Sequence, residues 1–475
     1  MHERVIKGGR VALPTGWGQC DIGIDDGRIS AIGADLDGAS TTDASGLWVM
    51  PGGIDAHCHL DQPSWGGAET ADGFSSGSIS AAFGGTSCII PFAMPGPNMS
   101  TFAAVERSLE CANGQSILDY GLHGVMTPAS GEPDEELRAL AAAGIPSVKA
   151  FMTYDGFAVS DELMLAMMDC GRSLGMTVMV HAENDAIIRR TTLKLLQAGK
   201  TGFPYHAVAH GEAAEREATH RVATLAEVSG SRVVIVHVST AQSLDEVTRS
   251  QARGTDVVAE TCPQYLLLDA SYLAGKPEDA ARFVFSPPPR SVRSQNALWD
   301  GLTAGTISLW SSDHSPYRLA DKLPEGRDVR FDRAVSGIPG IETRLPILFS
   351  EGLLTNRLSL ERYLAVAGGN AAAIYGLDHL KGRISVGLDA DLALWDPTVT
   401  WTLRSAELHS GVDFTPYEGR SLTGKPVTVL VRGTPVIEDG KLLPGLPRGQ
   451  FIKRRAANPS TFKYPIEETT PWLDI

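Results

Sequence analysis

The chain has 475 residues, enough for about three average domains or for one large α/β barrel with a smaller flanking domain. Its 43% apolar and 20% charged residues exclude a disordered protein. The formal net charge of −15 argues against nucleic acid or an anionic membrane surface as a partner. No apolar run reaches the ~18 residues of a membrane span. The first residues lack the pattern of a secretion signal, so we expect a cytoplasmic protein.

Residues 1–50 predict short strands, because Gly8-Gly9 and Asp26-Gly27 interrupt short apolar runs. Residues 51–375 contain eight apolar runs that alternate with helical patterns such as 161–174. The runs are Ile54–His57, Ser87–Pro91, Tyr120–Met126, Ser147–Met152, Thr177–His181, Arg232–Val238, Asp256–Glu260 and Thr306–Trp310. Alternating strands and helices predict an α/β fold with a parallel sheet, and eight repeats favour a (β/α)8 TIM-like barrel over an open doubly wound sheet.

Residues 376–450 again have the character of strands and turns. The predicted strands are Arg383–Val386, Asp391–Trp395, Val427–Arg432 and Thr434–Glu438. Because this character matches that of residues 1–50, we expect the two chain ends to form one small β domain. The tail, 451–475, is rich in proline and polar residues and is either an arm on a neighbour or loose.

The strongest local signal is the sequence Asp55-Ala56-His57-Cys58-His59 at the end of the first run. On a strand, residues i and i+2 point the same way, so His57 and His59 can bind one metal centre, whereas Cys58 points into the opposite layer and packs there. An isolated pair of histidines with this spacing arises by chance about as often as it marks a metal site. His181 and His237 end later runs, and a histidine there is usually a hydrogen-bonded core residue. Together, at the active face of a parallel barrel, they favour a metal site.

Asp313 ends the eighth run and is either a helix N-cap or a carboxylate ligand that doubles as a base. Lys149 stands inside an apolar run, where it either extends to solvent or has reacted with CO₂ to give a carbamate. Charge favours the carbamate beside two divalent ions. The ions bring +4, and one aspartate, one hydroxide and one carbamate reduce this to +1. An ammonium group would add charge and offer no lone pair, so beside two metals Lys149 is either modified or not a ligand.

These residues resemble the amidohydrolase superfamily, and within it the dihydropyrimidinase/hydantoinase family of cyclic amidases, over about residues 1–450. The motifs that carry the resemblance are PGGIDAHCHLDQP at 51–63, AAFGGTS at 81–87, VKAFMTYDG at 148–156, HAEN at 181–184, VHVST at 236–240, ETCPQYL at 260–266, SPPPR at 286–290, SDHSPY at 312–317, GIPGIETRLP at 337–346 and GRISVGLDADLALWDP at 382–397. The ordered set is specific, although each motif alone is modest evidence.

The resemblance implies a barrel with a β-sandwich built from both chain ends, two divalent metal ions and a homotetramer. Zn²⁺ is the default metal, with Mn²⁺ or Co²⁺ as alternatives. The ligands it implies are His57, His59 and Asp313 for one ion, His181 and His237 for the other, and carbamylated (N6-carboxylated) Lys149 together with a hydroxide for both. It also implies that Tyr154 stabilises the oxyanion, that Asp313 transfers the proton, and that Ser286 and the backbone near Ser336 align the ring.

The function implied is a hydrolase that opens a dihydropyrimidine or 5-substituted hydantoin to an N-carbamoyl amino acid. Members often have Asn where this chain has Ser336, and many have Lys where it has Asp155. Trp65, Phe92 and Phe157 either line the entrance or pack the loops. Asp61 would repel the carboxylate of dihydroorotate, which argues against a dihydroorotase. Three alternatives remain: an allantoinase, an amidase for another cyclic or acyclic amide, and a non-catalytic scaffold. The scaffold is disfavoured because all six metal-ligand positions are filled.

Overall fold

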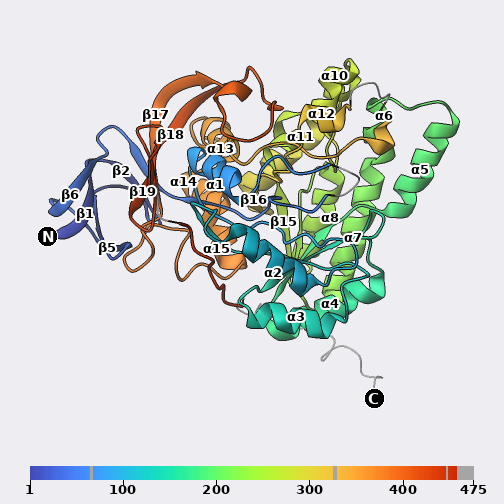
Figure 1. Ribbon diagram of the computed structural model, residues 1–475, viewed down its shortest axis with the longest axis horizontal. Coiled ribbons are helices and arrows are strands. Elements are labelled where there is room, and N and C mark those ends of the chain that lie inside the picture. The colour runs from blue at the N-terminus through green and yellow to red at the C-terminus, as the bar shows by residue number, and fades with distance from the viewer. Residues whose placement is uncertain (65–67, 325–328, 446–447, 457–475) are drawn as a thin grey trace.

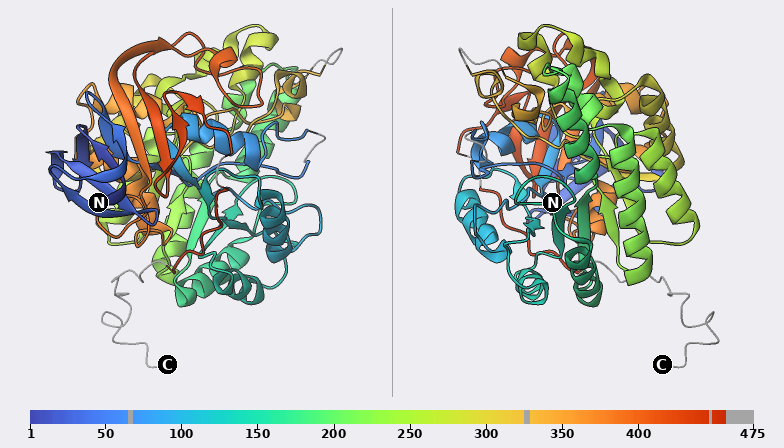
Figure 2. Two further views of the ribbon diagram at one scale, coloured as in Figure 1. Left: turned by 60° about the vertical axis from the view of Figure 1, so that its left-hand side comes forward. Right: turned by 90° about the vertical axis from the view of Figure 1, so that its right-hand side faces the viewer.

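The computed structural model describes residues 1–64, 68–324, 329–445 and 448–456, shown in Figures 1 and 2. Strands from the two chain ends lie on one side of the molecule, and helices α2 to α8 lie on the other (Figure 1). None of the helices in the described part of the chain is both long and apolar enough to span a membrane.

Two parallel sheets fill the middle of the chain. One has three strands in the order β10-β9-β8, and the other has six in the order β11-β12-β13-β14-β15-β16. The strands are β8 (Gly53–Asp55), β9 (Thr86–Ile89), β10 (Asp119–Tyr120), β11 (Gly124–Val125), β12 (Ser147–Phe151), β13 (Thr177–His181), β14 (Val233–Ile235), β15 (Val257–Thr261) and β16 (Ile307–Trp310). The predicted parallel sheet is therefore confirmed, but the run 120–126 is two strands in different sheets, not one.

Helices follow most of these strands. They are α1 (Phe74–Phe83), α2 (Thr101–Ala112), α3 (Pro133–Ala142), α4 (Asp161–Leu174), α5 (Asp185–Gln197), α6 (Pro204–Ala209), α7 (Glu212–Ser229), α8 (Ala241–Ala252), α9 (Pro263–Leu267), α10 (Pro277–Ala280), α11 (Val292–Ala304), α12 (Leu319–Lys322), α13 (Arg344–Leu348), α14 (Leu360–Leu364) and α15 (Asn370–Ile374). Helix α4 has the predicted bounds, because Ser160 caps its N-terminus and Gly175, at a φ of 65°, ends it.

The parallel strands are apolar on both faces. Along β13 and β14, Met179 and Val234 belong to one buried cluster, whereas Val178 and Val233 belong to another. This alternation is typical of a parallel sheet that is covered on both sides. The carboxyl ends of the strands meet at one edge, and the functional residues lie there.

The chain ends form two further sheets. One has the order β5-β4-β1-β6, and the other, β20-β19-β18-β17-β7-β2-β3, joins strands from both ends as expected. Their bounds are β1 (His2–Lys7), β2 (Arg10–Leu13), β3 (Gly16–Gln19), β4 (Asp21–Asp25), β5 (Arg28–Gly33), β6 (Gly38–Asp43), β7 (Trp48–Pro51), β17 (Leu392–Thr402), β18 (Ser421–Val431), β19 (Thr434–Glu438) and β20 (Lys441–Leu442). The strand predicted at 383–386 is wrong, because Gly382 and Gly387, at φ 98° and 90°, bend the chain on either side of it.

The described part of the tail packs on its own chain. The backbone N–H of Ile452 donates to the carbonyl of Tyr120 at 2.8 Å, and buried Arg454 donates to the carbonyl of Tyr375 at 3.4 Å. These contacts place this part of the tail against β10 and the end of α15. Residues 457–475 lie outside the described part.

Candidate metal centre and its cavity

Two segments that follow β8 and β16 run side by side and bring the first ligands together. The backbone N–H of Asp313 donates to the carbonyl of His57 at 2.9 Å, and that of His59 donates to the carbonyl of His314 at 2.8 Å. Asp313 has a φ of 49°, a conformation that is uncommon for a residue other than glycine and that concentrates at functional sites. The pairing places His57, His59 and Asp313 at one edge of the parallel strands.

Nitrogen and oxygen donors gather at this edge. Nε2 of His57 is 3.0 Å from Oδ1 of Asp313, and Nε2 of His59 is 3.5 Å from the same oxygen. Donor atoms of His57, His237 and Asp313 lie within 4.8 Å of one another. The ring centroids of His181 and His237 are 4.5 Å apart. Because imidazole and carboxylate are ligands that Zn²⁺ and similar ions prefer, the donor set fits a metal centre.

Lys149, on β12, lies inside this cluster. Its Nζ atom is 3.1 Å from Nε2 of His57 and lies 4.1 and 4.9 Å from the ring centroids of Phe92 and Phe151. The residue is only 1% exposed, which excludes a lysine that extends to solvent. It has no ion pair with any carboxylate of the described residues, and burial lowers its pKa to about 8. An amine that loses its proton near neutral pH is a nucleophile that can react with CO₂.

Two buried glutamates support the histidines and were not among the predicted site residues. Oε1 of Glu260 accepts hydrogen bonds from Nδ1 of His57 at 2.6 Å and from the backbone N–H of His237 at 3.1 Å. Oε2 of Glu183 is 2.8 Å from Nε2 of His181. A carboxylate on one ring nitrogen directs the lone pair of the other toward a metal. One feature of the sequence could have identified them as site residues: both glutamates stand at or just after the end of an apolar run.

Burial controls the protonation of the cluster. It lowers the pKa of His59 to about 4 and also lowers those of His181 and His237. Against the effect of burial, His57 holds the pKa of Asp313 well below the ordinary range. His57 differs from the other rings, because two neighbouring carboxylates raise its pKa against burial and the charge of Lys149. His59, His181 and His237 are therefore neutral near pH 7 and Asp313 is ionised, and these are the forms that bind a cation.

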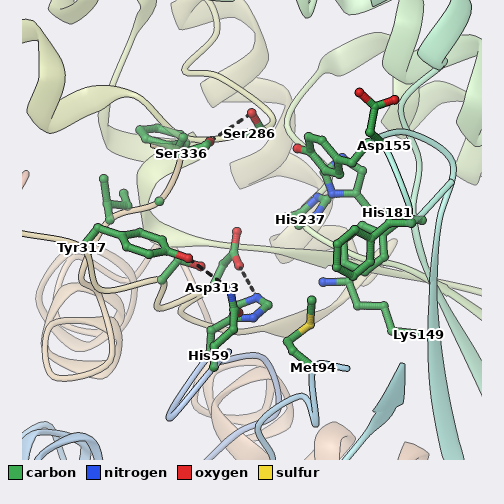
Figure 3. Close-up of a pocket in the computed structure, with 18 residues that line it drawn as sticks. His59, Met94, Lys149, Asp155, His181, His237, Ser286, Asp313, Tyr317 and Ser336 are labelled. Atoms are coloured by element: carbon green, nitrogen blue, oxygen red, sulfur yellow. Dashed lines mark hydrogen bonds and ion pairs between the residues drawn. The ribbon is translucent and has the colours of Figure 1, made fainter. Parts of the chain in front are cut away.

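The cluster opens into a cavity of about 310 Å³ (Figure 3). His57 lies fully buried behind it. The other predicted site residues line it: His59, Lys149, Tyr154, His181, His237, Ser286, Asp313 and Ser336. The structure therefore brings all the predicted site residues together. The rest of the wall is mainly apolar and includes Met94, Phe151, Phe157, Phe285 and Ile338.

Three of the hydroxyl groups in the wall belong to predicted site residues, namely Tyr154, Ser286 and Ser336. Ser336 Oγ donates to Ser286 Oγ at 3.1 Å, and Ser286 Oγ lies 3.3 Å from Nε2 of His206. In Figure 3, Ser286 and Ser336 lie across the cavity from Lys149. Burial raises the pKa of Tyr154, so its hydroxyl stays protonated and can donate a hydrogen bond. Tyr154 also has a positive φ, of 79°.

The residues expected at the entrance have different roles. Phe157 lines the cavity, whereas Phe92 is buried against the His57 ring, with centroids 4.8 Å apart. Trp65 lies outside the described residues. Asp155 lines the cavity and forms an ion pair with Arg189.

Known proteins are similar to this chain in sequence and in architecture. The model of the amidohydrolase family matches residues 48–436. The D-hydantoinase of Geobacillus stearothermophilus is 39% identical over 455 residues, which are 95% of this chain and 96% of that protein. The solved structures of a D-hydantoinase from Bacillus sp. AR9 and a dihydropyrimidinase from Brevibacillus agri are 38% and 35% identical. Both have a TM-score of 0.92 and a match covering 95% of this chain and 99% of theirs. The chain therefore belongs to the amidohydrolase family, within its group of hydantoinases and dihydropyrimidinases.

Proposed function

We propose that this chain opens the ring of a dihydropyrimidine or a 5-substituted hydantoin by hydrolysis, which yields an N-carbamoyl amino acid. The observation that carries the proposal is the position of Lys149, a buried amine 3.1 Å from His57 within a cluster of histidines and one aspartate. Relatives that match nearly the whole chain are named D-hydantoinase and dihydropyrimidinase. An apolar cavity with few polar groups suits a small cyclic substrate.

The family implies a centre of two metal ions, and the donor set supports one. The proposed ligands are His57, His59 and Asp313 for one ion, His181 and His237 for the other, and carbamylated Lys149 for both. We propose Zn²⁺, with Mn²⁺ or Co²⁺ as alternatives, because availability as well as affinity selects the metal. When bound, such ions lower the pKa of water and supply hydroxide at neutral pH.

The side chains would perform the remaining chemistry. Asp313 accepts a proton from the attacking water and delivers it to the ring nitrogen, while the C–O bond forms and the C–N bond breaks. Tyr154 donates a hydrogen bond to the carbonyl oxygen, where negative charge develops. Ser286 and the backbone near Ser336 hold the ring through hydrogen bonds on the opposite side of the cavity.

We also propose that the two parallel sheets are parts of one (β/α)8 barrel, residues 51–375. Two parallel bridges between the sheets support closure: Cys58 with His314, and Phe92 with His123. The sheets of the chain ends support a β-sandwich made of residues 1–50 and 376–450, followed by the tail 451–475. The family resemblance suggests a homotetramer, and sedimentation equilibrium tests this assembly.

The experiment is ring opening by protein that is loaded with zinc in bicarbonate buffer. The panel contains dihydrouracil, hydantoin, 5-aryl hydantoins, allantoin and dihydroorotate. Turnover of dihydrouracil or a hydantoin supports the proposal. Activity on allantoin alone would assign the chain to that branch. No turnover in protein that retains two metal ions would contradict the substrate class, and failure to bind metal would favour a non-catalytic scaffold.

A further inference from the structure

Lys322, the last residue of α12, is a second lysine without access to solvent. It is 1% exposed, and it has no ion pair within the described part of the chain. Its ammonium group instead donates to two backbone carbonyls, that of Val284 at 2.8 Å and that of Val335 at 3.0 Å. Lysine is almost never fully buried without a charged partner, and desolvation of its charge costs free energy. An apolar side chain would fill the same space without this cost, so packing alone does not explain the lysine.

The two carbonyls belong to segments that form the polar wall of the cavity. One is the 284–286 segment, in which Val284 is followed by Phe285 and Ser286. The other is the 335–338 segment, in which Val335 is followed by Ser336, Gly337 and Ile338, all of which line the cavity. No helix or strand contains either segment, so single bonds rather than a ladder hold each of them. The His206 ring bonds to the carbonyl of Phe285 at 2.9 Å, and the backbone N–H of Ser315 donates to the carbonyl of Ile338 at 3.0 Å.

Few bonds connect the two segments directly. The backbone N–H of Gly337 donates to the carbonyl of Val284 at 3.1 Å, and Ser336 Oγ donates to Ser286 Oγ at 3.1 Å. Lys322 adds two charge-assisted bonds from one atom, one to each segment. When the amine is charged, such hydrogen bonds are about twice as strong as neutral ones, and in either form Lys322 is the one side chain of this set that bonds to both segments.

We propose that Lys322 is a positioning residue, which fixes the distance between the 284–286 and 335–338 segments and so the width of the wall that holds the ring. This inference rests on the proposed function, because Ser286 and Ser336 are assigned there to ring binding. Lys322 does not line the cavity and touches no reacting atom. Its loss therefore affects ring binding more than the chemical step. Burial lowers its pKa to about 7, so the charged and neutral amines are both present at neutral pH, and either form has enough N–H groups to donate to both carbonyls.

The test compares steady-state kinetics of Lys322→Met and Lys322→Arg with the unmodified protein, on the ring that it opens best. Lys322→Met keeps the length but removes both donors, so we expect KM to rise roughly 10- to 100-fold, with kcat reduced much less and metal content unchanged. Lys322→Arg keeps charge and donors and should restore KM to within about threefold of normal. Lys322→Gln, too short to reach both carbonyls, carries the same prediction as Lys322→Met if the latter does not fold.

Ile24→Ala is the control, because Ile24 lies in the buried cluster of the terminal strands, which contains no residue of the cavity wall. It should lower the melting temperature and leave KM unchanged. An unchanged KM in folded Lys322→Met, or an equal rise in Ile24→Ala, would overturn the inference. If the unmodified protein opens no ring, the proposed function fails. The positioning role is then tested by the Kd for hydantoin, measured by calorimetry. Equal Kd values in the unmodified protein and in Lys322→Met would overturn that role.

Discussion

Glu260 connects two of the proposed metal ligands through one buried carboxylate. It accepts hydrogen bonds from the His57 ring, the backbone of His237 and the hydroxyl of Ser311, at 2.6, 3.1 and 3.0 Å. The bond to Nδ1 of His57 fixes the tautomer in which Nε2 faces Asp313 and Lys149. The orientation of two ligands thus depends on a residue that binds no metal itself.

Glu260→Gln should lower metal affinity roughly 10- to 100-fold, because the amide is uncharged and a weaker acceptor for the imidazole N–H. Competition with a chelator measures the affinity. Glu227→Gln is the matched control, since Glu227 lies at the surface and forms an ion pair with Arg253 there. Equal affinity in Glu260→Gln and the unmodified protein would show that the carboxylate does not orient the ligands.

The sequence identified the histidines more easily than the glutamates. His57, His59 and His181 follow apolar runs, where an imidazole at a strand end is itself a signal. A glutamate at the end of an apolar run is less informative, because it is also typical of a strand whose last residue is exposed to solvent. The role of Glu260 depends on His57, 203 positions away, so no local pattern could reveal it.

At the scale of elements, the run 120–126 shows why one predicted strand became two. His123, between β10 and β11, is fully buried, and its ring bonds to the carbonyl of Ala56 at 3.0 Å and to Ser147 Oγ at 2.6 Å. The ring thus connects the two parallel sheets where strand pairing changes. Ala56 and Ser147 are distant in sequence, so the apolar pattern predicts the strand but not its interruption.

Cys58 was predicted to pack rather than react, and the structure supports this prediction. It is fully buried in the large apolar cluster, and burial raises its pKa well above the ordinary range. Because the thiolate is the nucleophile, such a thiol is inert. We expect Cys58→Ala to keep kcat/KM within about threefold and to lower the free energy of unfolding by roughly 1–2 kcal/mol. A loss of activity greater than a hundredfold, with metal retained, would assign the sulfur a chemical role.

At the scale of the whole molecule, Lys381 joins the terminal strands to the parallel sheets. Its Nζ atom is 2.8 Å from Asp119 on β10, 2.9 Å from Asp389 and 2.8 Å from Asp391. These three carboxylates lie as close together as metal ligands do, but the ammonium group of Lys381 and the guanidinium of Arg432 already pair with them. We interpret this cluster as a structural connection between the two parts of the chain.

Lys381→Met should lower the free energy of unfolding by about 3–5 kcal/mol, because three buried carboxylates lose a partner. Despite burial, Asp391 and Asp389 raise the pKa of Lys381 above its ordinary value. Its contribution is therefore complete below the unfolded pKa of about 10.4 and is lost as the pH rises through the folded pKa. Urea unfolding should therefore give the same difference in free energy of unfolding between Lys381→Met and the unmodified protein at every pH from 7 to 9. A difference no larger than that of Lys441→Met, an exposed lysine on β20, would contradict the role.

Much of the overall architecture was predictable. Alternating apolar and helical segments predict parallel strands, and the matching character of the chain ends predicts their shared sheet. The order of the strands within that sheet was not predictable. For example, β7 pairs with β17, so Pro51 lies beside Leu392, a residue that is distant in the sequence. Contacts of this range depend on the whole core rather than on local sequence.

The most direct test of the role of Lys149 is hydantoin hydrolysis by the unsubstituted chain and by Lys149→Ala, both loaded with zinc in bicarbonate buffer. We expect two metal ions per unsubstituted chain and rapid ring opening. For Lys149→Ala we expect the loss of a bound ion and a fall in kcat/KM of at least about a thousandfold. Ring opening by Lys149→Ala at the normal rate, with two metal ions retained, would contradict the central role assigned to this buried lysine.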